Sequence, residues 1–385
     1  MRSESSVSRG FAIRNICFLI STLIAGTSVG SAADLTYQKK IDAIFSAAGL
    51  KSHRAPGAAA LVMKDGRVLF ERGYGVTDLA SLTAIGPRTN FRLASVSKQF
   101  TAMAVMLLVH DGKLHYEDRL TDIFPDFPAY GSAITIRNLL NHTSGLHDYE
   151  DLMPPSDPDA PVEQIQIQDA GVLDLLKQQK GTKFAPGTKW AYSNSGYVLL
   201  GLIVQKVSGR PFSDFLHDRI FVPLGMINTL AYVRGKDEVP NRAFGHSLED
   251  GKWRKTDQSP TSATLGDGGI YSSLADLAKW DQALRQKTLL SEREMQSALT
   301  PVKVAEGEVT EPDGSPAAYG FGWFLNLYKS HGRMWHYGET MGFRTSIQRF
   351  DQDNLTIVIL CNRADLDPSA LALKIADLFL LPEKP

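Results

Sequence analysis

A serine and a lysine stand three residues apart where a helix is expected to begin. Ser95 and Lys98 form an S-x-x-K pattern, and the apolar periodicity of residues 99–109 predicts a helix directly after them. Because residues i and i+3 share a helix face, Lys98 would lie beside the Ser95 hydroxyl. The positive helix N-terminus would stabilise a developing alkoxide, and a desolvated lysine that loses its proton could act as general base. The pattern indicates a nucleophilic serine, with a helix N-cap as the alternative role.

Two further short motifs carry side chains suited to acid–base chemistry. Tyr192 and Asn194 form the sequence's one Tyr-x-Asn, between a turn and a helical pattern, where a phenol could relay a proton and an amide could orient a substrate. A turn with a packed aromatic ring is the alternative. His336 and Gly338 form a His-x-Gly at an expected strand start, where a glycine lets backbone approach a ligand closely. A second His-x-Gly at residues 110–112 fits an ordinary helix end.

Other patterns give no further site. A G-x-S-x-G match at residues 26–30 lies inside the expected signal peptide, and the sequence has no P-loop, no H-E-x-x-H and no paired Cys/His metal spacing. His142 and His147 stand five residues apart in an expected loop, a spacing more typical of local hydrogen bonding than of metal ligation. We therefore expect neither a cofactor nor a metal.

The first 33 residues resemble a secretory signal peptide. Three arginines precede a short apolar run at residues 16–26, and small residues end in Ala32-Ala33. The run is shorter than the ~20 residues of a membrane span, so we expect cleavage rather than an anchor, and no span afterwards. The protein is predicted to be exported to a bacterial periplasm or secreted. Only Cys361 would remain, in an apolar strand pattern that indicates a buried structural thiol.

Composition excludes several classes of protein. The chain has 385 residues, 43% of them hydrophobic, with 41 Lys and Arg against 42 Asp and Glu. This balance lacks the basic excess that a nucleic-acid-binding protein needs to neutralise phosphates. Ordinary Gly and Pro usage excludes a disordered or collagenous chain. The length provides ample core for a two-lobed catalytic unit.

The strand patterns gather at both ends of the chain. Residues 57–63 and 67–71 flank an Asp-Gly turn, and residues 343–350 alternate in period two before a second strand that ends at Cys361. Helical patterns fill the middle. We therefore expect an α+β fold, with an antiparallel sheet flanked by helices in a discontinuous α/β lobe at 34–96 and 265–385. A mostly helical lobe at 97–264 would be inserted, with the active site between the lobes.

The order of the three motifs resembles the penicillin-recognising serine hydrolases, which include class C β-lactamases, D-alanyl-D-alanine carboxypeptidases, D-aminopeptidases and related carboxylesterases. The S-x-x-K, Tyr-x-Asn and His-x-Gly follow one another in this family's order over essentially the whole mature chain. Further stretches look like the same family: Leu139-Leu140-Asn141-His142-Thr143-Ser144-Gly145-Leu146, Pro223-Leu224-Gly225-Met226 and Gly268-Gly269-Ile270-Tyr271-Ser272. The resemblance implies a β-lactamase/transpeptidase-like fold.

The resemblance also implies a role for each candidate residue. Ser95 would be acylated and Lys98 would be its base, while Tyr192 would carry the proton to the leaving group. Asn194 would hold the substrate amide or the lysine. His336 would take the place of the Lys of K-T-G. The backbone amides of Ser95 and Glu339 would form the oxyanion hole, close to Gly338.

The histidine at position 336 bears on the substrate. A lysine there offers a permanent charge to a carboxylate, whereas histidine is mostly neutral at pH 7. We therefore expect a serine hydrolase that acts through an acyl-enzyme on small esters, amides or peptides. Arg344 could restore carboxylate recognition, or it could simply face solvent.

Two alternatives remain open. One is a β-lactamase or D-alanyl-D-alanine carboxypeptidase proper, whose substrates are β-lactams or cell-wall peptides. The other is a catalytically silent penicillin-binding-like module that binds the cell wall. The natural substrate, the oligomeric state and the first proton acceptor, Lys98 or Tyr192, are not set by the sequence.

Overall fold

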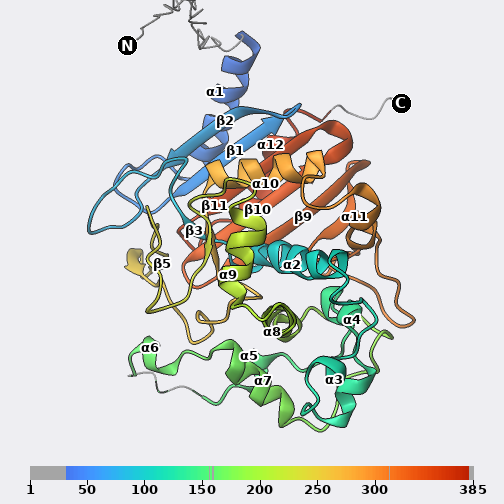
Figure 1. Cartoon of the computed structure of the whole chain (residues 1–385). Coiled ribbons are helices and arrows are strands. Elements are labelled where there is room, and N and C mark those ends of the chain that lie inside the picture. The colour runs from blue at the N-terminus through green and yellow to red at the C-terminus, as the bar shows by residue number, and fades with distance from the viewer. Residues whose placement is uncertain (1–31, 156, 158–159, 312, 381–385) are drawn as a thin grey trace, which may run out of the picture.

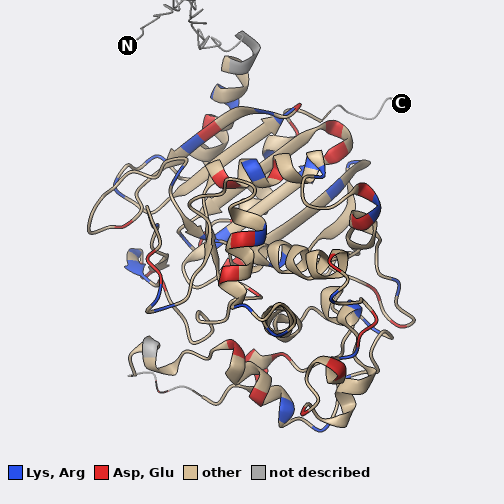
Figure 2. Cartoon of the chain, viewed as in Figure 1, with Lys and Arg blue, Asp and Glu red and all other residues tan. Residues whose placement is uncertain are grey.

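The computed structural model describes residues 32–155, 157, 160–311 and 313–380. The predicted signal peptide, residues 1–33, lies outside the described residues except for its last two positions. Figure 1 shows a sheet with helices on both faces at one end of the molecule and a layer of helices at the other. Basic and acidic residues are interspersed along both parts of the chain (Figure 2). None of the helices in the described part is both long and apolar enough to cross a membrane.

A six-stranded antiparallel sheet joins the two ends of the chain in the order β2-β1-β11-β10-β9-β8. Its strands are β1 (Ala58–Lys64), β2 (Arg67–Tyr74), β8 (Phe324–Tyr328), β9 (His331–Thr340), β10 (Phe343–Phe350) and β11 (Leu355–Cys361). The central strands β1 and β11 are buried on both faces, which explains their nearly continuous apolar sequences.

Alternate residues of β1 send their side chains into two separate cores. Ala60 and Val62 pack with α1 (Ala32–Ala47) and α12 (Pro368–Ala376) on one face. Leu61 points to the opposite face, where α10 (Leu274–Gln286) and the helical part of the chain lie. The second core continues from the sheet into the helices and holds both parts together.

The helical part is built around two apolar helices. It consists of α2 (Lys98–His110), α3 (Leu120–Ile123), α4 (Ile136–Leu140), α5 (Tyr149–Leu152), α6 (Val162–Ile165), α7 (Asp169–Lys177), α8 (Asn194–Ser208) and α9 (Phe212–Leu216), with α11 (Glu292–Leu299) nearby in the last third of the chain. Helices α2 and α8 pack between the sheet and the other helices (Figure 1). Ser193 caps the start of α8 by accepting from Gly196 N, and Gly209 ends it in the left-handed region.

Short strands occur in segments where the sequence predicted no strand. Strands β5 (His246–Glu249) and β6 (Lys252–Lys255) form a hairpin, and β3 (Phe91–Arg92), β7 (Ile270–Ser272) and β4 (Leu230–Ala231) form a small sheet. The β5–β6 turn is an Asp-Gly pair, Asp250 and Gly251, both at positive φ, so the hairpin cue was present in the sequence. The predicted α+β fold class is confirmed, while the lobe boundaries stay a prediction.

A buried ion cluster ties α10 to the sheet. Asp281 is fully buried and its carboxylate lies 2.8 Å from Arg349 Nε and 2.7 Å from Arg285 Nε. The Thr356 hydroxyl donates to the same carboxylate at 2.7 Å. Burial alone would raise the pKa of Asp281, but the charge of Arg349 and the hydrogen bonds hold it below its ordinary value. The pKa is depressed, so the cluster stabilises the fold at neutral pH and loses this contribution as the pH falls through the folded-state value.

Replacing Asp281→Asn should destabilise the fold by about 3 kcal/mol, because the buried Arg349 guanidinium would lose its buried counter-charge and keep only the exposed carboxylate of Asp351. Urea unfolding followed by circular dichroism measures this difference. Glu117→Gln is the matched control, since it breaks an exposed pair with Arg137 and should cost less than about 1 kcal/mol. Equal stability losses in the two variants would show that the cluster is not a structural anchor.

Candidate active site

The residue before Ser95 adopts a strained backbone conformation. Ser95 lies in a single 3-10 turn, η1 (Ala94–Ser97), that leads directly into α2. Ala94 has φ +49°, in the left-handed region that a residue with a Cβ enters only at a cost of about 1–3 kcal/mol. The other three residues of the turn are buried, whereas Ser95 is partly exposed. The turn thus presents one hydroxyl to the surface at a helix N-terminus.

Lys98 is fully buried and makes three hydrogen bonds through its terminal nitrogen. Nζ lies 3.0 Å from Ser95 Oγ, 2.8 Å from Asn194 Oδ1 and 3.0 Å from the carbonyl oxygen of Asp267. Burial lowers the pKa of Lys98 to about 8, although the negative charges of Asp267, Asp148 and Glu150 act in the opposite direction. A substantial fraction of this lysine is therefore neutral near physiological pH.

The three hydrogen-bond partners of Lys98 Nζ determine where the lone pair of the neutral amine points. The amide oxygen of Asn194 and the carbonyl of Asp267 can only accept hydrogen bonds, so a neutral amine must give its two hydrogens to them. The remaining lone pair is left for Ser95, whose hydroxyl can donate. The geometry therefore orients neutral Lys98 as a proton acceptor from Ser95.

Asn194 is held in one orientation by two carboxylates at the start of α5. Its side-chain nitrogen lies 3.3 Å from Glu150 Oε1, which leaves its oxygen for Lys98. Its backbone amide donates to Asp148 Oδ2 at 2.7 Å. These carboxylates were not predicted from the sequence, because they lie more than 40 residues from Asn194. The acidic run at residues 148–151 was the available signal.

Tyr192 places its ring over the lysine. Lys98 Nζ lies 4.9 Å from the centre of the Tyr192 ring. Burial raises the pKa of the Tyr192 hydroxyl, and the nearby Ser95 hydroxyl opposes this rise. The phenol is therefore protonated at neutral pH and can give a proton more readily than it can take one. The four residues predicted from S-x-x-K and Tyr-x-Asn lie together.

His336 lies in the middle of β9, not at a strand start, and is buried behind Tyr192 with 6.2 Å between the ring centres. Its Nδ1 lies 2.6 Å from the carbonyl oxygen of Tyr337, and its Nε2 lies 3.0 Å from the Tyr319 hydroxyl. Burial, together with the charge of Lys98, lowers the pKa of His336 to about 3. The ring is neutral, and both nitrogens are engaged within the protein. Tyr319 was not predicted from the sequence.

Gly338 lets β9 pack directly against the nucleophile turn. A Cβ on Gly338 would lie 2.1 Å from the Leu93 carbonyl oxygen and 2.3 Å from Thr345 Oγ1. The Thr345 hydroxyl donates to the same Leu93 carbonyl at 2.8 Å. The close approach expected from this glycine is thus to the protein's own backbone, two residues before Ser95.

Glu339 and Arg344 pair with each other on the β9–β10 hairpin. Arg344 Nη2 lies 2.7 Å from Glu339 Oε1, and Nη1 donates to the backbone oxygens of Thr340 and Phe343. Glu339 and Thr340 border the cleft beside Ser95. The Arg344 guanidinium is therefore committed to its own hairpin. The proposed oxyanion role of the Glu339 amide stays a prediction.

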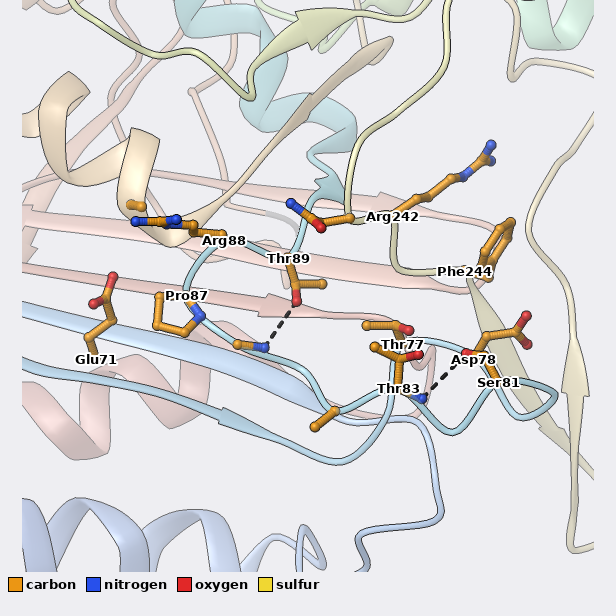
Figure 3. A pocket seen from close by; sticks show the side chains of 14 residues that line it. Glu71, Thr77, Asp78, Ser81, Thr83, Pro87, Arg88, Thr89, Arg242 and Phe244 are labelled. Carbon is orange, nitrogen blue, oxygen red and sulfur yellow. Dashed lines mark hydrogen bonds between the residues drawn. The ribbon is translucent and has the colours of Figure 1, made fainter.

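The cleft at Ser95 is small, with a volume of about 50 Å³. Asn194, Glu150 and Asp267 line it together with residues of the η1 turn. A larger pocket of about 890 Å³ lies elsewhere, between β2, the loop that follows it and residues 241–244. In Figure 3 Glu71 and Arg88 lie near one end of this pocket and Phe244 near the other. None of the predicted site residues lines this larger pocket, whereas Ser95, Asn194 and Glu339 line the smaller cleft.

Replacing Gly338→Ala should lower kcat/KM for an ester substrate by about 100-fold, because the new Cβ would push β9 and the Ser95 turn apart. Initial rates with p-nitrophenyl butyrate measure the effect, with circular dichroism to confirm folding. Gly332→Ala, on the same strand, is the control, since its Cβ would meet its nearest neighbour at 3.9 Å. Similar activity in the two variants would contradict the packing role of Gly338.

Comparisons with known proteins show the family to which the chain belongs. The family model described as Beta-lactamase matches residues 41–381. Penicillin-binding protein 4* of Bacillus subtilis is 33% identical over 90% of this chain and 78% of its own length. A D-aminopeptidase of Brucella abortus is 28% identical over 87% of this chain, which spans 62% of that longer protein. The structure of D-amino acid amidase from Ochrobactrum anthropi superposes on this one with a TM-score of 0.74 and 25% sequence identity. The match covers 89% of this chain and 98% of the amidase chain. The chain therefore belongs to the Beta-lactamase family and is a serine hydrolase.

Proposed function

We propose that the protein is an exported hydrolase that forms a covalent acyl-enzyme on Ser95 from small esters or amides, with D-aminoacyl amides preferred. The observation that carries the proposal is the environment of Lys98. A fully buried amine with two neighbours that can only accept hydrogen bonds is left with its lone pair toward Ser95. This arrangement suits a general base for a serine nucleophile.

Acylation begins when neutral Lys98 takes the Ser95 proton. Oγ then attacks the substrate carbonyl carbon, and the carbonyl oxygen becomes an oxyanion beside the first amides of the η1 turn, which have no acceptor within the turn. Collapse of this intermediate breaks the bond to the leaving amine or alkoxide. Tyr192, protonated at neutral pH, gives its proton to the leaving group and regains one from the Lys98 ammonium.

Deacylation repeats these steps with water in place of the leaving group. Water loses a proton to the Lys98–Tyr192 pair and attacks the acyl carbon, and the proton returns to Ser95 Oγ as the ester bond breaks. Each cycle restores neutral Lys98 and protonated Tyr192. These two residues therefore suffice for both proton transfers, and the raised pKa of Tyr192 favours Lys98 as the first acceptor.

The charges around the cleft favour a substrate that carries an ammonium group. Glu150, Asp267 and Glu339 line the cleft. Arg92 also borders it, but is only 3% exposed. Its Nε and Nη2 donate to backbone carbonyls, and its Nη1, which has no partner among the described residues, is buried away from solvent. Arg344 is paired with Glu339. A substrate carboxylate would meet carboxylates before it met an available cation. This supports N-terminal D-amino acid amides over penicillins, and relatives named D-aminopeptidase and D-amino acid amidase support it further.

Export is proposed on the signal-peptide pattern of residues 1–33 alone. Fractionation of cells that express the full chain, followed by N-terminal sequencing of the mature protein, tests it. A new N-terminus at Asp34 in the exported fraction supports the proposal. Full-length protein confined to the cytoplasm contradicts it.

Purified protein should cleave D-alanine p-nitroanilide at least about tenfold faster than its N-acetyl derivative, the difference expected for one hydrogen bond to a charged group. Initial rates for both, with nitrocefin and p-nitrophenyl butyrate alongside, measure the preference. Glu150→Gln should reduce the advantage of the free amine more than it affects the butyrate.

Turnover must disappear in a folded Ser95→Ala variant. Faster turnover of nitrocefin than of the other substrates would favour a β-lactamase. Cleavage of a peptide ending in D-alanyl-D-alanine but not of the anilide would favour a carboxypeptidase. Wild-type protein that neither turns over any substrate nor reacts with a fluorophosphonate probe would favour a silent binding module.

The value of kcat/KM for p-nitrophenyl butyrate should rise with pH and level off above about 8, because the reactive form of Lys98 is the neutral amine. Among the carboxylates that raise the pKa of Lys98, Asp267 has the largest effect. The inflection of the pH profile should therefore move to lower pH in Asp267→Asn. Asp65→Asn, an exposed change far from the site, should leave the profile in place. An inflection that stays fixed or moves upward in Asp267→Asn would rule out Lys98 as the titrating base.

A further inference from the structure

The hydrogen bonds of His336 fix the tautomer of its neutral ring. The Tyr337 carbonyl can only accept, so Nδ1 must carry the ring hydrogen in the 2.6 Å bond between them. Burial of the ring lowers its pKa, and in the neutral ring Nε2 is bare and accepts from the Tyr319 hydroxyl at 3.0 Å. Tyr319 is itself fully buried, so water cannot replace this donor.

The Tyr319–His336 pair lies in an aromatic cluster that surrounds Tyr192. The His142 ring centre lies 4.4 Å from that of Tyr192 and 4.7 Å from that of Tyr319. His142 Nδ1 accepts from the Ser193 amide at 3.2 Å, so its hydrogen is on Nε2. His336, with its hydrogen on Nδ1, and His142, with its hydrogen on Nε2, therefore lie on either side of Tyr192. Hydrogen bonds within the fold select both tautomers.

We propose that Tyr319 is a positioning residue for acylation. Its hydroxyl holds His336 as the neutral Nδ1–H tautomer, so the imidazole ring behind Tyr192 adds no positive charge beside Lys98. This inference rests on the proposed roles of Ser95, Lys98 and Tyr192. His336 then acts through its neighbours and does not touch the substrate, unlike the direct role predicted from the family motif.

The surroundings of His336 explain why its charge state matters. The groups that face it are Lys98 from α2, Tyr192 from the segment before α8, His142 from the loop after α4, Tyr319 and Phe324 from the segment around β8, and Tyr337 from β9. Lys98 is the group among these that carries charge at neutral pH. A positive His336 would repel the Lys98 ammonium that forms during acylation.

Tyr319→Phe keeps the ring and removes the donor. The hydrogen bond favours neutral His336, so its loss should raise the pKa of this histidine and let it take a proton at higher pH. The loss of kcat/KM should therefore be larger at pH 6 than at pH 9, with a new ionisation on the acid side of the profile.

Tyr130→Phe is the matched control. It removes a hydroxyl that donates to the Leu176 carbonyl at 2.6 Å, from a tyrosine whose ring packs on Phe127 and not on the cluster around Tyr192. A merely structural role for Tyr319 would change stability in both variants and move neither pH profile. Parallel profiles for wild type and Tyr319→Phe, with activity reduced equally at every pH, would overturn the proposal.

Nitrogen NMR of the histidine side chains gives a readout independent of turnover. In the full mature chain carrying Ser95→Ala, His336 should show a protonated Nδ1 and a bare Nε2 from pH 5 to pH 9, and Tyr319→Phe should add a titration within this range. A wild-type His336 that is protonated at Nε2 or titrates near pH 6.5 would overturn the proposal even if the phenylalanine variant fails to fold. If instead Ser95→Ala retains full activity, the proposed function fails, while the NMR result for His336 stands on its own.

Discussion

The burial of one amine is the constraint on which the site depends. Lys98 has no contact with solvent, and its nitrogen is satisfied by Ser95, three residues before it, together with two acceptors from distant parts of the chain. Asn194 follows it by 96 positions and Asp267 by 169. A shift of α8 or of the segment before β7 by a fraction of a hydrogen-bond length would leave a buried charge unsatisfied, which is costly.

The sheet holds the turn that carries Ser95 in place from the side opposite α8. Gly338 allows β9 to lie against the Leu93 carbonyl, and Thr345 donates to that carbonyl from the neighbouring strand. Ala94 can then be held at positive φ, because contacts on both sides of the turn over-determine its conformation. The strained turn projects Ser95 toward the lysine, so the reactive geometry is a product of strand packing as much as of helix register.

Local patterns were sufficient to predict the parts of the site that lie close together in the sequence. Ser95 and Lys98 share a helix face, and Asn194 begins a helix capped by Ser193, so both motifs follow from short-range rules. Asp148, Asp267 and Tyr319 could not be predicted in this way, because only the tertiary fold brings them to the site. The strand pattern around His336 was visible, but not the tyrosine that occupies its second nitrogen.

The acidic residues around Lys98 act on the site in two opposing ways. Burial favours the neutral amine, and the charges of Asp267, Asp148 and Glu150 favour the ammonium, so the pKa settles at about 8. The same carboxylates would attract a substrate ammonium. Once such a group lies beside Glu150, it offsets part of the negative potential at Lys98, and deprotonation becomes easier when substrate is bound. A neutral His336 belongs to the same balance, because a fixed positive ring would lower the proton affinity of Lys98 further and weaken it as the base.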